Sequence, residues 1–136
     1  MAVDPKLVWA KSISVQTTVI ELNAQDYSQQ QVGKLKFWGG VEITSPNKNF
    51  GGLSGLIIDD EGQSLLAVTD HGYWLQASLE YDDRGYLSGM SNVKLSKLRD
   101  RDGEKISGKR KADSEAIERT RDGVVVSFER NHRLWR

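Results

Sequence analysis

The chain has 136 residues, which is enough for one domain with a single modest core. Its 19 basic and 19 acidic side chains balance, so no net field attracts nucleic acid or an anionic membrane. Cysteine is absent and no apolar run approaches the length of a membrane span, which excludes disulfides, thiolate catalysis and helical membrane insertion. We therefore expect no nucleic-acid partner and no membrane insertion. The start, "MAVDPKLVW", lacks the basic and apolar stretches of a secretory signal.

Short segments rich in Val, Ile, Leu and Tyr predict strands along most of the chain. The expected strands cover residues 14–22, 33–44, 53–59, 64–70, 74–81, 87–95, 114–119 and 124–129, and a further strand begins at Arg133. The turns "DDEG", "DDRG" and "TRDG" place acidic residues before a glycine that can adopt positive φ. Residues 25–31 are expected to form a polar loop, and residues 99–112 a charged surface connection that packs poorly. Since no stretch carries a convincing helical pattern, the predicted class is all-β.

Two segments of the chain repeat one pattern. Residues 54–75 and 115–134 both run from a short apolar strand, through an acidic turn ending in glycine, into a second apolar strand. The repeat aligns Asp70 with Glu129, about 60 positions further on, and two more strands follow the first copy before the second begins. Four strands per unit at this period are typical of a propeller blade.

The repeat predicts the architecture. We expect a β-propeller of four-stranded antiparallel blades, present as an incomplete portion of about two to two-and-a-half blades, because closure takes about four to eight. One domain is expected over residues 1–136, with an N-terminal strand and polar loop at 1–31 and blade repeats at 32–136. The chain is then a piece of a longer propeller or one subunit of an assembly. We also expect it to associate with itself or with the remaining blades, because unpaired strand edges invite pairing.

The motifs "FGGLSGL", "LAVTDHG", "DSEAI", "DGVVVSFER" and "HRL" occur in this order over roughly residues 32–136. In that order and spacing they resemble the phytase-like (esterase-like phytase) domain family of bacterial proteins. The resemblance implies a longer propeller, a periplasmic or secreted location, and hydrolysis of a phosphoester or ester small molecule by recurring acidic residues. Two positions depart from the family's pattern: Ala116 stands where glycine is common, and His71 where arginine is common.

The resemblance also implies a site. The family's recurring acidic and acidic-arginine motifs fall on Asp70, on Asp113 and Glu115, and on Glu129 and Arg130. We expect Asp113, Glu115, Glu129 and Arg130 to be catalytic, and Asp70, Asp113 and Glu115 to bind a metal. Clustered carboxylates suit Ca²⁺, which neutralises phosphate and activates water, and a guanidinium can clamp phosphate oxygens.

Structural roles compete with these assignments. An aspartate before glycine, as at Asp70, usually caps its own turn, and Glu129 with Arg130 could form an ion pair that pins neighbouring strands. Alternation along a strand places Asp113 and Glu115 on one face, where two like charges are unfavourable without a cation, so the functional interpretation is favoured there. Two functions follow: a metal-assisted phosphoester hydrolase, or a non-catalytic propeller module that binds a partner.

Overall fold

The computed structural model describes residues 10–100 and 102–136, and its largest element is an antiparallel sheet of five strands. Four strands follow one another in an up-and-down meander, and β1 pairs with the outer edge of the last one. The strands are β1 Lys11–Ser12, β6 Leu53–Ile58, β7 Ser64–Thr69, β8 Tyr73–Tyr81 and β9 Leu87–Lys97, in the spatial order β1-β9-β8-β7-β6. The four strands predicted within 53–95 are thus confirmed to within two residues at each end.

The turns of this meander form as predicted, through aspartate side chains and positive-φ glycines. In the turn after β6, Asp59 Oδ1 accepts hydrogen bonds from the backbone N–H groups of Gln63 at 2.7 Å and Ser64 at 3.1 Å. Gly62 completes that turn with φ of 71°. After β8 an equivalent cap forms at Asp82, so both turns depend on a carboxylate bound to backbone donors.

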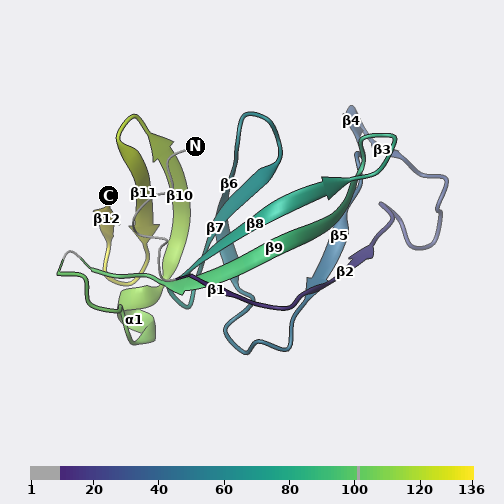
Figure 1. Cartoon of the computed structure of the whole chain (residues 1–136). Helices are drawn as coiled ribbons and strands as arrows, with labels where there is room; N and C mark the ends of the chain where they lie inside the picture. The colour runs from purple at the N-terminus through teal and green to yellow at the C-terminus, as the bar shows by residue number, and fades with distance from the viewer. Residues whose placement is uncertain (1–9, 101) are drawn as a thin grey trace.

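A second antiparallel sheet of three strands lies beside the first (Figure 1). It consists of β10 Ser114–Thr120, β11 Gly123–Phe128 and β12 Arg133–Trp135, and the one-turn helix α1 Lys109–Ala112 precedes it. The two predicted strands and the strand beginning at Arg133 are therefore confirmed. The described residues form a mostly β structure with antiparallel sheets and one short helix. This helix is not long and apolar enough to cross a membrane.

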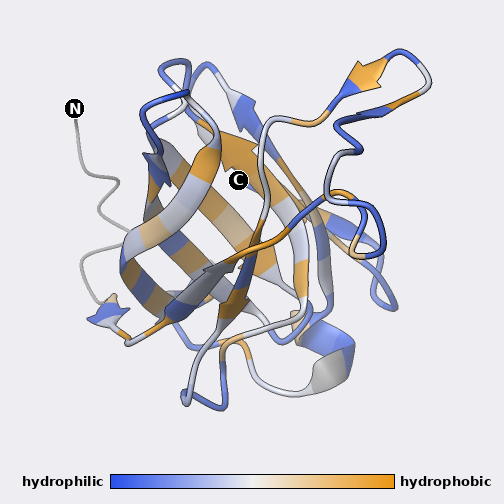
Figure 2. Ribbon diagram, turned by 90° about the vertical axis from the view of Figure 1, so that its right-hand side faces the viewer, coloured by the Kyte–Doolittle hydropathy of each residue, from blue (hydrophilic) through white to orange (hydrophobic). Residues whose placement is uncertain are grey.

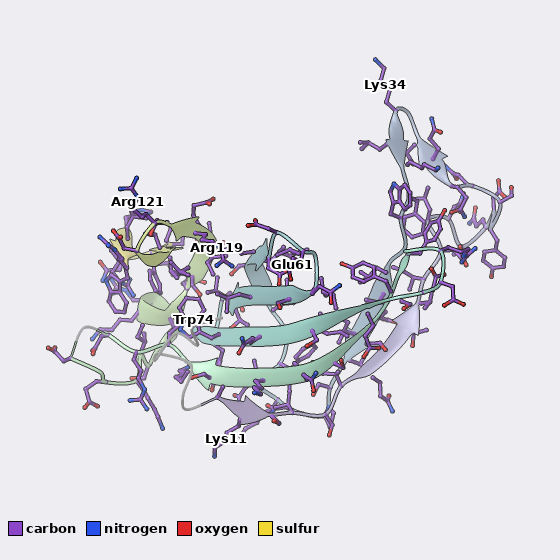
Figure 3. All side chains as sticks on the ribbon, turned by 45° about the horizontal axis from the view of Figure 1, so that its top comes forward. Lys11, Lys34, Glu61, Trp74, Arg119 and Arg121 are labelled. Atoms are coloured by element: carbon purple, nitrogen blue, oxygen red, sulfur yellow. The ribbon has the colours of Figure 1, made fainter. Side chains whose placement is uncertain are left out.

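The N-terminal part of the described chain forms two small ribbons. β2 Gln16–Val19 pairs with β5 Val41–Thr44, and β3 Gln31–Val32 pairs with β4 Leu35–Lys36. The β3–β4 hairpin projects away from the sheets (Figures 1 and 2), with Lys34 at its tip (Figure 3). A continuous strand over 33–44 was the wrong prediction, because Gly39 adopts φ of 94° and breaks the extended backbone between β4 and β5.

The strand β7 packs against apolar clusters on both faces of the five-stranded sheet, and alternation along it shows how. Leu65 and Ala67 point into one apolar cluster, which the β2–β5 ribbon covers from its side through Ile43. Leu66 and Val68 point the other way, into a cluster between the two larger sheets. Figure 2 shows apolar residues in bands across neighbouring strands.

The connection over 99–112 packs more tightly than the sequence indicates. Ile106 is 4% exposed and Ala112 is 2% exposed, and both join Leu98 in the cluster between the sheets. The backbone N–H of Ile106 donates to the Leu98 carbonyl at 2.9 Å, which turns the loop back onto the sheet. The prediction of a loosely packed surface connection was wrong, because two apolar residues among many charges are enough to anchor it.

Candidate metal-binding site

The second hairpin brings three acidic residues to one place. Asp113 lies between α1 and β10, Glu115 lies in β10, and Glu129 follows β11. Because β10 and β11 run antiparallel, the start of one strand lies beside the end of the other. The Glu129 backbone N–H donates to the Asp113 carbonyl at 2.9 Å, which fixes the two ends together.

The three carboxylates converge. One oxygen from each of Asp113, Glu115 and Glu129 lies within 4.8 Å of the other two. Asp113 is buried, at 4% exposed, whereas both glutamates are exposed. The register of β10 against β11 shifts between Ser114 and Ala116, so a bulge at Glu115, and not simple strand alternation, sets the direction of that side chain.

Arg130 adds a positive charge to the group. Its Nε lies 2.7 Å from Asp113 Oδ2, and its backbone adopts φ of 54°. A non-glycine residue in the left-handed region costs about 1 kcal/mol, and the charge-assisted contact with a buried carboxylate offsets it. Three carboxylates and one guanidinium give −3 + 1 = −2, the formal charge that one divalent cation neutralises.

The donor set suits a hard cation. Carboxylate oxygens are the ligands that Ca²⁺ prefers, and uncompensated carboxylates this close repel one another. Arg130 holds one oxygen of Asp113, so the other oxygen and the two exposed glutamates would supply the ligands. Asp113, Glu115 and Glu129 thus fit a divalent ion chemically, with Arg130 bound to the buried Asp113.

Asp70, the remaining residue of the predicted site, lies outside this group. Its Oδ1 is 3.2 Å from His71 Nδ1, and its backbone N–H donates to the Gly52 carbonyl at 2.9 Å. That backbone bond repeats the one from Glu129 to Asp113, so Gly52 stands in the first hairpin where Asp113 stands in the second. The two hairpins therefore share a backbone plan, but only the second gathers acids.

The correspondence between Gly52 in the first hairpin and Asp113 in the second was not predicted from the sequence. A Cβ built on it would lie 1.9 Å from Asp70 Oδ1, so the Asp70 carboxylate occupies the space that a side chain at position 52 would need. Extending the internal repeat by two residues towards the N-terminus aligns Gly52 with Asp113, which is the signal that could have identified it.

The two copies of the repeat also differ in the length of a turn: the turn after β11 is one residue longer than the turn after β7. Val68 pairs with Trp74 across the first turn, whereas Ser127 pairs with Leu134 across the second. Five residues separate the first pair and six the second, so Trp74 corresponds to Leu134. The sequence alignment of Leu75 with Leu134 was therefore shifted by one position.

The serine of "GGLSGL" has a structural role. Ser54 Oγ donates to the Ser114 carbonyl, and Ser114 Oγ donates to the Thr69 carbonyl at 2.5 Å. These two hydroxyls link the five-stranded sheet to β10. Within residues 10–100 and 102–136 neither hydroxyl is paired with a base, as a nucleophilic serine would be.

The fold and the site define a class: a mostly β protein of antiparallel sheets with an acidic, arginine-flanked group at the end of a hairpin. The model of the phytase-like family, described as "Esterase-like activity of phytase", matches residues 48–136. The match covers more than half of the chain, so the chain belongs to this family, as its motifs indicated. No curated protein and no solved structure matches it.

Proposed function

We propose that the acidic group is the centre of a metal-assisted hydrolase site that acts on phosphoesters. The observation that carries the proposal is the convergence of Asp113, Glu115 and Glu129 beside Arg130, in a chain of the phytase-like family. Asp70 is left out of the proposed site because it lies apart from this group, in its own turn.

Each residue then has a distinct role. The oxygens of Asp113, Glu115 and Glu129 would hold Ca²⁺, which when bound supplies neutralisation of phosphate charge and a more acidic water. Arg130 holds the Asp113 carboxylate and provides further N–H donors, which suit the oxygens of a phosphate group. The exposure of the two glutamates leaves the group open to a substrate from solvent.

We also propose that the two larger sheets are successive blades of a β-propeller. Their first two strands form similar hairpins, with a register shift near the start of both β6 and β10. The sheets pack face to face across an apolar cluster, and a Cβ at Gly55 in β6 would lie only 2.9 Å from backbone atoms of β10. Close approach of the first strands and face-to-face packing are what adjacent blades require.

A non-catalytic propeller module remains the second candidate. The 2.7 Å contact between Arg130 and Asp113 favours it, because an ion pair on a buried carboxylate pins the start of β10 to the turn after β11. Under this alternative the two glutamates are surface charges and no metal is needed.

Hydrolysis of a chromogenic aryl phosphate, with Ca²⁺ and with a chelator, separates the two candidates. Glu115→Gln is the informative variant, because its exposed side chain makes no hydrogen bond or ion pair in the described part of the chain. We expect Ca²⁺-dependent turnover that this variant lowers by about 100-fold or more.

Glu118→Gln is the matched control, since Glu118 lies on the same strand, is exposed and stands outside the acidic group. It should retain the activity of the unmodified chain. No turnover in any of the three proteins, at any calcium concentration, would reject the hydrolase in favour of the binding module.

A further inference from the structure

A pocket of about 300 Å³ lies near the acidic group, and the charged residues of its lining are basic. Ala112, which lines it, directly precedes Asp113 in the chain. The other lining residues come from the loop before β6, the β7–β8 turn, the start of β8, the end of β9 and the residue before α1: Lys48, Asn49, His71, Tyr73, Lys97 and Gly108. None of these residues is acidic, so the charged groups of the pocket favour an anion.

Lys97 is held in place inside this lining. Its Nζ donates to the His71 carbonyl at 2.8 Å and lies 4.1 Å from the centre of the Tyr73 ring. Partial burial lowers the pKa of Lys97, because a desolvated ammonium is less stable when charged. In the described part of the chain no carboxylate lies within ion-pair distance of it, so an anionic ligand would supply the missing counter-charge.

A turn presents the second cation of the pocket. Asn47 Oδ1 accepts a hydrogen bond from the Asn49 backbone N–H at 3.0 Å, and the Asn47 carbonyl accepts one from Phe50 at 2.9 Å. This turn fixes the backbone around Lys48 and Asn49, which both line the pocket. Lys48 and Lys97 are 49 positions apart in the sequence, so only the fold brings them to one cavity.

We infer that this pocket binds a phosphate group, with Lys48 and Lys97 neutralising its charge and Asn49 and Tyr73 available as neutral donors. Two ammonium groups match the charge of a phosphate dianion, and the volume accommodates a phosphate with part of an attached group. The inference rests on the proposed function only for the source of the phosphate, which would be the phosphoester substrate. Binding of free phosphate follows from the pocket alone.

Titration calorimetry of the whole chain with inorganic phosphate, in the presence of a chelator, tests the pocket without a metal. We expect saturable binding that Lys97→Met and Lys48→Met each weaken by about tenfold or more. Lys94→Met is the matched control, because Lys94 is an exposed lysine of β9 that lies outside the pocket. Lys48→Met guards against misfolding, since Lys48 is exposed and lies in a loop.

The outcomes for the pocket and for the hydrolase are separable. Absent phosphate binding, or binding that both pocket variants leave unchanged, would overturn the inference even if the chain hydrolyses aryl phosphates. Phosphate binding that depends on both lysines supports it even if no turnover is found. If a phosphomonoester binds more tightly than free phosphate, and its KM rises in Lys48→Met, the pocket is a site for the substrate. If the phosphomonoester and free phosphate bind with equal affinity, the pocket is a site for free phosphate.

Discussion

Asp113 and Gly52 hold matching places in two similar hairpins, but acids gather only beside Asp113 among the described residues. Beside Asp113 lie the carboxylates of Glu115 and Glu129. Beside Gly52 the carboxylate of Asp70 fills the space itself. The sequence motifs predicted both Asp70 and Asp113 as site residues, because a motif gives the identity of a residue and not which side chains lie near it in the fold.

Asp82 gives the clearest dependence of stability on pH. The hydrogen bond from the Tyr86 backbone N–H, supported by the Arg84 side chain, lowers the pKa of Asp82 below its ordinary value of 3.8. A carboxylate with a lowered pKa in the folded chain stabilises the fold above the unfolded value, and this stabilisation is lost as pH falls through the folded value.

We therefore expect Asp82→Asn to lower the midpoint of thermal unfolding at neutral pH. Well below pH 3.8 the variant and the unmodified chain should have the same midpoint. Asparagine keeps an oxygen for the two backbone donors and removes only the charge. Asp83→Asn is the control, since Asp83 is exposed and makes no side-chain hydrogen bond in the described residues. A difference at Asp82 that persists unchanged at low pH would contradict the assigned cause.

The strands and turns of the meander follow from local sequence signals, whereas the exceptions depend on contacts made by the folded chain. Acidic turns ending in glycine and alternating apolar residues were sufficient for β6 to β11. They could not predict the break at Gly39, which bridges to Leu87, or the burial of Ile106, which joins the cluster between the two sheets, because both depend on segments distant in the sequence. The extra residue in the turn after β11 could not be predicted, because Leu75 and Leu134 align in the sequence repeat. In the strand pairing it is Trp74 that corresponds to Leu134.

Gly55 tests the packing of β6 against β10. A Cβ there would lie 2.9 Å from both Ala116 Cα and Ile117 N, and these backbone atoms cannot move without separating the sheets. We expect Gly55→Ala to lower the free energy of unfolding by about 1–3 kcal/mol, measured by chemical denaturation.

Gly89→Ala is the comparison. Its Cβ would meet the Glu80 carboxylate at 2.7 Å, which is the end of a flexible exposed side chain, so we expect a much smaller loss. Equal losses at the two glycines would show that β6 and β10 do not approach as closely as described.

For the whole molecule, the fold class and the family could be predicted from the sequence, but the spatial arrangement of the charged side chains could not. The recurring motifs identified the family and the acidic residues of the second hairpin. The pocket of Lys48 and Lys97 carried no sequence signal, because its two cations come from segments far apart in the chain. Neither residue falls in a motif or an internal repeat.

Exposed strand edges should cause the chain to associate. β12 pairs only with β11 in the described part of the chain, and its Leu134 is 69% exposed. We expect a dimer or larger species by light scattering, and expect Leu134→Lys to shift it towards monomer because an edge lysine discourages pairing. Leu35→Lys, at a 77% exposed leucine on the projecting hairpin, should not do so. A monomer for the unmodified chain would contradict this expectation.

We propose that Asp113, Glu115 and Glu129 form a binding site for a divalent cation. Calorimetric titration of the whole chain with Ca²⁺ tests it most directly. We expect a single calcium ion per chain, which Glu115→Gln and Glu129→Gln each bind at least about tenfold more weakly and Glu118→Gln binds with unchanged affinity. Heat of dilution alone in the unmodified chain, or the same affinity in all four proteins, would contradict it.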